Sequence, residues 1–164
     1  MAPARAIGSI SDLVLKPPAT TNRRLIPVPH QVVWDVLADP FAYAGWVVGS
    51  KAIRDADDGF PAPGTKFHHS VGVGPLTVCD HTEVEAADPP RYLRLRAKAR
   101  PIGTATVELE LTPADGGTVV RMSERPDGLY APLALNPLVH VATKLRNAES
   151  LRRLERLALA RHSA

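Results

Sequence analysis

Hydrophobic and polar residues alternate along most of the chain between residues 50 and 125, which is the pattern of half-buried β-strands. Short segments rich in Asp, Gly and Pro separate the alternating stretches, and connections of this length make neighbouring strands antiparallel. The pattern predicts a first strand at residues 20–26, followed after an interval by strands at 50–55, 65–71, 76–86, 91–99, 105–112 and 118–125.

Two short helical segments follow the first strand. One covers residues 29–37 and stops at Asp39-Pro40, because proline pushes the residue before it out of helical geometry; the other covers 41–47 and is closed by Gly49. Helices of this length are unstable alone and must be held by packing. Four of the chain's eight aromatic residues lie here: Trp34, Phe41, Tyr43 and Trp46. We interpret them as the side chains that fasten these helices, and Trp46 as either a packing residue or a residue at a pocket.

The last predicted element is one long helix. Asn136 is a favourable N-cap, Pro137 a favourable first residue, and nothing breaks the helix before about Ala160. At 1.5 Å per residue it is about 36 Å long, enough to cross a sheet. Its apolar residues at spacings of three and four predict one buried stripe, made of Leu138, Val141, Leu145, Ala148, Leu151, Leu154 and Leu157. The predicted fold class is α+β, with a seven-stranded antiparallel sheet covered by this helix.

Composition and charge set further limits. With 164 residues, 45% of them hydrophobic and 23% charged, we expect one globular domain at residues 20–164, preceded by a loosely ordered extension at 1–19. The net charge of +3 is spread without a basic stripe, so no nucleic-acid partner is expected. No run approaches the ~20 apolar residues of a membrane span. The single cysteine, Cys79, allows no internal disulfide, and we expect a cytoplasmic location. A monomer and a homodimer both stay open.

The alternation also predicts which side chains share the inner face of the sheet. Leu95 and Ala97 define the inner face of strand 91–99. A four-residue turn at 87–90 then places Asp80 opposite Ala97, and a four-residue loop at 72–75 places Asp80 opposite Phe67 and Val78 opposite His69. One row across the inner face therefore reads Phe67, Asp80, Ala97, Val107 and Glu124.

This inner face combines two carboxylates and an imidazole with small residues. Because unpaired buried charge is costly, Asp80 and Glu124 need partners, water or a place at the rim, and a ligand pocket meets that need. In the alternative interpretation Asp80 bonds to His69 or Thr82, and Glu124 lies at an exposed strand end. The predicted pocket lining is Trp46, Phe67, Val78, Thr82, Leu95, Ala97, Val107, Met122, Glu124, Val141 and Leu145.

Several segments resemble the START-like (SRPBCC) superfamily, of the polyketide cyclase/dehydrase type. They are VWDVLADP with the aromatic-rich helix after it, PAPGTKFHH, GPLTVCDHTEVEAADPPRYLRLRA, GGTVVRMSE and NPL…RNAESLRRL, and the resemblance covers residues 20–160. It implies the helix-grip fold, in which a curved sheet grips the long helix around a deep cavity. It also implies a small hydrophobic ligand such as a lipid, a sterol or a polyketide. These motifs define the fold and supply no catalytic set.

Three functions are compatible with these residues. The leading one is binding of a small apolar molecule. The second is a polyketide cyclase or dehydratase reaction, in which His69 and Asp80 form the catalytic acid–base pair that moves a proton beside a carbonyl. The third is metal binding on the outer face, where His68 is predicted to lie opposite Cys79 and His81 follows two residues along. A fourth ligand is missing there and no cavity encloses the site. We therefore predict neither a metal nor a cofactor.

Overall fold

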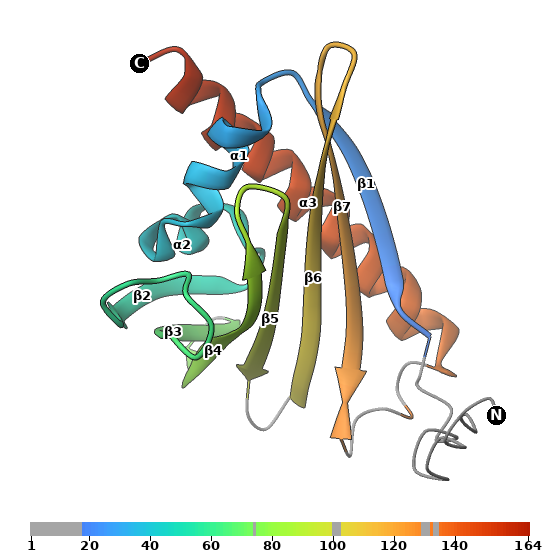
Figure 1. Ribbon diagram of the computed structural model, residues 1–164. Coiled ribbons are helices and arrows are strands. Elements are labelled where there is room, and N and C mark those ends of the chain that lie inside the picture. Colours follow the sequence, from blue (N-terminus) through green and yellow to red (C-terminus); the bar gives the residue numbers. More distant parts are fainter. Residues whose placement is uncertain (1–17, 74, 100–102, 129–131, 133–134) are drawn as a thin grey trace, which may run out of the picture.

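Seven strands form one antiparallel sheet in the order β1-β7-β6-β5-β4-β3-β2 (Figure 1). The computed structural model describes residues 18–73, 75–99, 103–128, 132 and 135–164, so the predicted extension at 1–19 lies almost wholly outside the described residues. The elements are β1 (Thr20–Ile26), α1 (His30–Leu37), the 3-10 turn η2 (Pro40–Ala42), α2 (Tyr43–Trp46), β2 (Ser50–Ala56), β3 (Lys66–Val73), β4 (Leu76–Asp88), β5 (Tyr92–Ala99), β6 (Gly103–Ala114), β7 (Gly117–Asp127) and α3 (Pro137–His162). The predicted α+β fold is confirmed.

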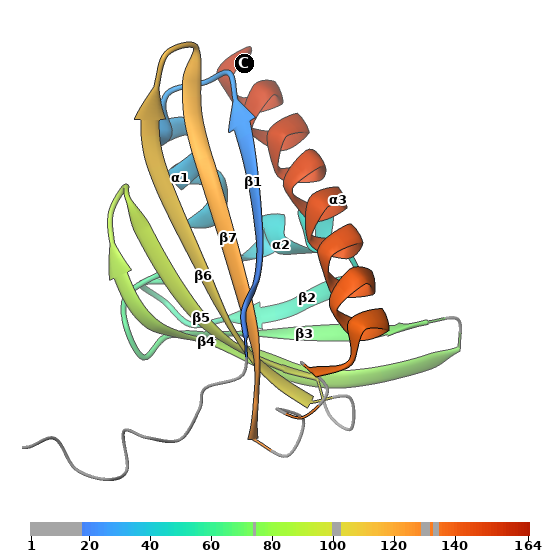
Figure 2. The same ribbon diagram turned by 90° about the vertical axis from the view of Figure 1, so that its right-hand side faces the viewer.

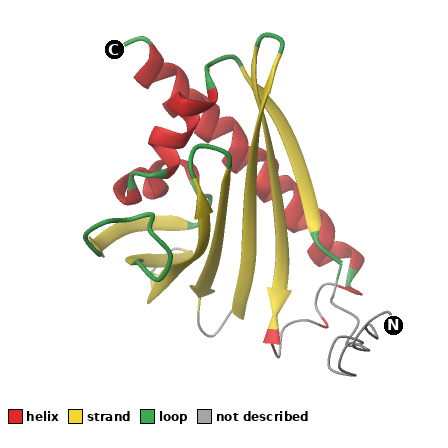
Figure 3. Cartoon of the chain, viewed as in Figure 1, coloured by secondary structure: helices red, strands yellow, loops and turns green. Residues whose placement is uncertain are grey.

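The sheet is strongly bent, and the helices lie on its concave side. Figures 1 and 2 show β2 and β3 running crosswise to β6 and β7, so that the sheet curls beneath α3. The helices α1, α2 and α3, red in Figure 3, form one group in which α1 and α2 pack on α3. Gly45 of α2 permits this approach, since a Cβ atom there would lie 3.3 Å from Leu157 of α3.

Side-chain caps fix where two of these elements begin. The Asp39 carboxylate accepts a hydrogen bond from the Phe41 amide at 3.0 Å, which starts η2 directly after the break at Pro40. Asn136 accepts one from the Leu138 amide at 2.9 Å and starts α3. Both caps satisfy an amide that has no partner inside its own helix. The predicted start of the long helix is thus confirmed. Among the described residues, no helix is long and apolar enough to cross a membrane.

The helix α3 packs along β1, β7 and the short helices, and its buried face differs from the predicted stripe. The residues that face the core are Asn147, Ser150, Leu151, Leu154 and Ala158. Leu138, Val141 and Leu145 are exposed, so the prediction that they are buried is wrong. Most steps in the predicted stripe are three residues, whereas an α-helix turns once every 3.6, so the stripe winds around the helix. Leu145 and Leu154, nine residues apart, lie on opposite sides.

The register of β4 on β5 differs from the predicted one by two residues. Asp88 pairs with Tyr92 across a turn one residue shorter than predicted, and a β-bulge at Glu85 follows. The shorter turn alone would exchange the two faces of β4, and the extra residue of the bulge exchanges them back. Thr82 therefore pairs with Ala97, two residues from its predicted partner, and stays on the predicted face.

The register of β3 on β4 is also displaced by two residues. Val73 pairs with Leu76, so the loop between these strands is shorter than predicted. The predicted row Phe67, Asp80, Ala97, Val107, Glu124 is wrong as a row. Phe67, Thr82 and Ala97 lie in one row of paired residues, and Leu95, Val107 and Glu124 lie in the next. Because both displacements are even, every member keeps its predicted face.

Candidate functional site

His69 of β3 and Asp80 of β4 are directly opposite each other on the inner face of the sheet. Both side chains are buried, with 5% of His69 and 3% of Asp80 exposed. His69 shares a hydrogen bond of 3.0 Å with the Thr82 hydroxyl through Nε2. Asp80 Oδ1 accepts a hydrogen bond of 3.0 Å from the His81 amide. The register thus brings a carboxylate, an imidazole and a hydroxyl together in the interior.

Burial controls the protonation of this imidazole. It lowers the pKa of His69, and the negative charge of Asp80 and the backbone of His81 oppose the shift without cancelling it. His69 is therefore neutral at pH 7 and has one N–H and one bare nitrogen. Its Nδ1 has no hydrogen-bond partner within the described part of the chain. A neutral buried imidazole of this kind can accept a proton or a hydrogen bond from a bound molecule.

An aromatic cluster forms the wall beside His69. The ring of Tyr43 lies 5.0 Å from that of Trp46 and 4.6 Å from that of Phe67, and the Phe67 ring lies 5.7 Å from that of His69. The Tyr43 hydroxyl donates a hydrogen bond of 2.9 Å to the Leu37 carbonyl, and burial raises the pKa of this phenol. Tyr43 and Trp46, two of the four aromatic residues predicted to fasten the short helices, therefore connect α2 to the inner face of β3, whereas Phe41 is exposed and the prediction is wrong for it.

Eight of the predicted lining residues share the inner face of the sheet and Trp46 lies on α2, and by burial these nine form two groups. One group is buried and consists of Trp46, Phe67, Thr82, Leu95 and Met122. The other is half-buried and consists of Val78, Ala97, Val107 and Glu124. Val141 and Leu145 of α3 are in neither group, because both are exposed, Leu145 to 68%.

Glu124 is neither at an exposed strand end nor unpartnered. Its carboxylate accepts a hydrogen bond of 3.0 Å from the Asn147 amide and forms an ion pair with Arg146, both on α3. Asn147 is fully buried. Nearby, Thr20 of β1 shares a hydrogen bond of 3.0 Å with His140 of α3. These contacts hold the first half of α3 against β7 and β1, so Glu124 has a structural role. Sequence reasoning missed Arg146 and Asn147.

The residues of the alternative metal site are only partly brought together. His68 pairs with His81, with their rings 6.0 Å apart, whereas Cys79 pairs with Ser70. The predicted pairing of His68 with Cys79 is therefore wrong. Within the described ranges, no group of three or more His, Cys, Asp or Glu side chains could hold a metal ion.

Residues 18–159 match the family model described as polyketide cyclase / dehydrase and lipid transport. The chain belongs to this family. The family is of the START-like type, so the resemblance seen in the sequence is confirmed. No protein with a curated description matches the chain.

Solved structures share the helix-grip fold of this family. A Staphylococcus aureus protein of unknown function is 12% identical, with a TM-score of 0.70 over 90% of this chain and 96% of that one. Ara h 8.0201 is 18% identical, with a TM-score of 0.68 over 87% of this chain and 98% of its own. A protein from Thermus thermophilus gives the same four values. At these identities the likeness shows the fold alone.

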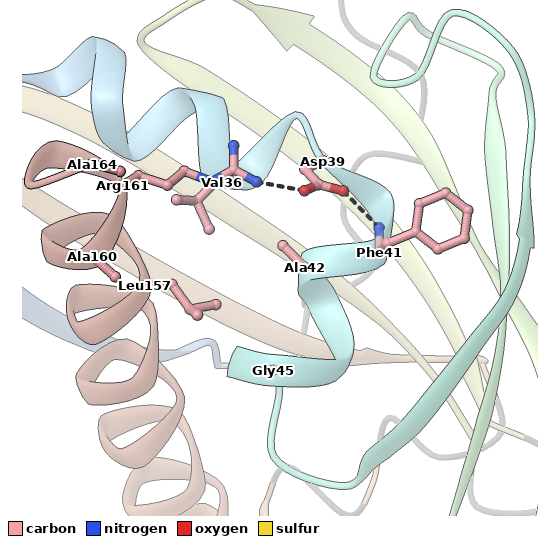
Figure 4. A pocket seen from close by; sticks show the side chains of 9 residues that line it. All are labelled: Val36, Asp39, Phe41, Ala42, Gly45, Leu157, Ala160, Arg161 and Ala164. Carbon is pink, nitrogen blue, oxygen red and sulfur yellow. Dashed lines mark hydrogen bonds and ion pairs between the residues drawn. The ribbon is translucent and has the colours of Figure 1, made fainter.

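This member of the polyketide cyclase / dehydrase family also has a groove between the short helices and the C-terminal end of α3, which the sequence did not predict. It has a volume of about 580 Å³ and is lined by Val36, Asp39, Phe41, Ala42, Gly45, Leu157, Ala160, Arg161 and Ala164 (Figure 4). Arg161 donates a hydrogen bond of 2.6 Å to the Asp35 carbonyl and forms an ion pair with Asp39. None of the predicted site residues lines it. The signal for this groove in the sequence was a small residue on each helix, Gly45 on α2 and Ala160 on α3.

Proposed function

We propose that this protein binds a small hydrophobic molecule between the concave face of the sheet and α3. The observation that carries the proposal is the incomplete cover of the inner face. Ala97 and Val107 are on the same face as buried Leu95, yet both are half-buried. The helix α3 packs on β1, β7 and the short helices, whereas Ala97 is on β5 and Val107 is on β6, in the middle of the sheet. An apolar surface next to buried polar groups is the usual composition of a small-molecule site.

The family description, which names lipid transport, supports the same proposal. Its test uses the apolar fluorescent probe N-phenyl-1-naphthylamine. We expect the wild-type protein to bind it, and Ala97→Phe to weaken binding at least about tenfold, because the new ring fills the space beside Thr82. The matched control is Arg96→Phe, which adds the same ring to the exposed outer face of β5.

Circular dichroism shows whether each variant is folded. Equal loss of binding in both variants, with the fold intact, would mean that the probe binds elsewhere. No binding to the wild type would remove the proposal.

The second candidate function is proton abstraction beside a carbonyl, and the neutral imidazole of His69 opposite Asp80 favours it. In this step Nδ1 takes the proton from the carbon, leaving an enolate. The enolate regains a proton at that carbon when the imidazolium gives one back. The family description, which names cyclase and dehydrase activities, is compatible with such a step.

Deuterium exchange tests this candidate. We expect the methyl protons of 2-acetylnaphthalene to exchange faster in D₂O with the protein than without it. The rate rises with pH as His69 loses its proton, and reaches a plateau below the ordinary imidazole value of about 6.5, because burial lowers the pKa of His69. His69→Gln should return the rate to background while probe binding persists, and His68→Gln on the outer face should not. Exchange unchanged in His69→Gln would leave a binding protein without this chemistry.

A further inference from the structure

Three buried polar atoms near the candidate site have no hydrogen-bond partner within the described part of the chain. They are Trp46 Nε1, Ser50 Oγ and His69 Nδ1. Trp46 is 1% exposed and His69 is 5% exposed. Leaving such groups unpaired costs free energy, so buried polar atoms in folded proteins nearly always have a partner. A partner is therefore expected from outside the described residues.

The three residues come from one end of the interior. Trp46 ends α2, and Ser50 begins β2 four residues later. Ser50 pairs with Val71 of β3, two residues along that strand from His69, so both side chains are on the inner face. The ring contacts from Trp46 through Tyr43 and Phe67 reach the same imidazole.

Neighbouring polar groups beside the aromatic cluster have hydrogen-bond partners, so the three unpaired atoms are exceptions among their neighbours. The Tyr43 hydroxyl bonds to the Leu37 carbonyl, and the Thr82 hydroxyl bonds to His69 Nε2. Farther along, the Ser150 hydroxyl accepts a hydrogen bond of 3.1 Å from the Val48 amide. In this wall the unpaired atoms are therefore Trp46 Nε1, Ser50 Oγ and His69 Nδ1, and the others in the described residues, on Asn22, Arg94 and Arg121, lie on β1, β5 and β7.

The chemistry of these groups defines what would satisfy them. An indole N–H can only donate, so Trp46 requires an acceptor. A serine hydroxyl donates or accepts, and the free nitrogen of a neutral imidazole does one or the other according to its tautomer. An oxygen atom with two lone pairs accepts from Trp46 and from a second donor, and a hydroxyl oxygen also donates.

We propose that the ligand is a hydrophobic molecule with a carbonyl or hydroxyl oxygen, and that Trp46 Nε1 donates a hydrogen bond to this oxygen in a polar subsite shared with Ser50 and His69. The inference rests on the proposed binding function and narrows its ligand class to oxygenated molecules. A pure hydrocarbon would fill the apolar space but leave the indole N–H unpaired.

Two probes of nearly the same shape test this inference. In 2-acetylnaphthalene a carbonyl stands where 2-isopropenylnaphthalene has a C=CH₂ group. We expect the ratio of the two affinities, ketone over hydrocarbon, to fall about tenfold in Trp46→Phe, which keeps an aromatic ring and removes the donor. The matched control is the same substitution at the other tryptophan, Trp34→Phe, which should leave the ratio unchanged.

A second measurement does not depend on Trp46→Phe being folded. In ¹⁵N-labelled Trp34→Phe, one indole N–H remains, that of Trp46. Its proton resonance should move downfield with the ketone and not with the hydrocarbon, because a new hydrogen bond deshields the proton.

The outcomes separate the two proposals. Binding of both probes with equal indole shifts, or with a ratio that Trp46→Phe does not change, overturns the inference and leaves the binding function in place. Failure of both probes to bind the wild type overturns the inference, and failure of N-phenyl-1-naphthylamine as well overturns the binding function.

Discussion

Replacing Leu154 by Ala should lower the free energy of unfolding by about 3 kcal/mol, whereas the same change at Leu145 should cost less than about 0.5 kcal/mol. Leu154 is 0% exposed in the interface of α3 with the core, so its loss leaves a cavity. Leu145 projects from the opposite side of the helix and loses little on truncation. Urea denaturation followed by circular dichroism measures both free energies.

The pair is matched, because both changes remove the same atoms from the same helix. Equal costs would show that α3 is rotated from the orientation described. A large cost at Leu145 alone would restore the buried stripe that the sequence predicts.

Replacing Glu124 by Ala should cost about 2 kcal/mol of unfolding free energy. The change removes the acceptor of the fully buried Asn147 amide and the ion-pair partner of Arg146. A buried donor left without an acceptor carries most of this cost, since the half-exposed Arg146 can turn to water. The same denaturation experiment measures it.

The control is Glu110→Ala on the neighbouring strand. Glu110 pairs with Arg121 at 2.8 Å, but both side chains are about as exposed as those of an ordinary surface pair. This pair should be worth about 0.5 kcal/mol or less. If the two variants lose the same stability, Glu124 does not anchor α3.

Local patterns predicted the fold well because the alternation of β-strands survives small errors of register. His69 and Asp80 were assigned to the inner face from turn lengths that were each incorrect, and the even displacements preserved their face. The direct pairing of His69 with Asp80, in contrast, was not predicted, because it depends on the actual length of the loop between β3 and β4. The sequence pattern alone does not distinguish registers that differ by two residues.

The long helix shows where sequence patterns fail and what signal was available. Leucines dominated the predicted stripe, although their three-residue steps do not follow one face of a helix. Asn147, Leu151, Leu154 and Ala158 are spaced by four, three and four residues, which does follow one face. The polar Asn147 hid this face, because its partner Glu124 is distant in the sequence and the contact exists only in the folded chain.

The compensating turn and bulge in β4 have a consequence for how this protein can vary through evolution. The bulge residue Glu85 projects on the outer side, where its carboxylate lies 3.0 Å from Arg94 and 3.5 Å from Arg96. Losing one residue, either at the bulge or in the turn beyond it, would turn Asp80 and Thr82 outward and bring Cys79 and His81 inward. A change in the length of the bulge or of the turn therefore keeps the inner face of β4 only when the other length changes with it, so the two places form a single inherited unit although neither contains a residue of the candidate site.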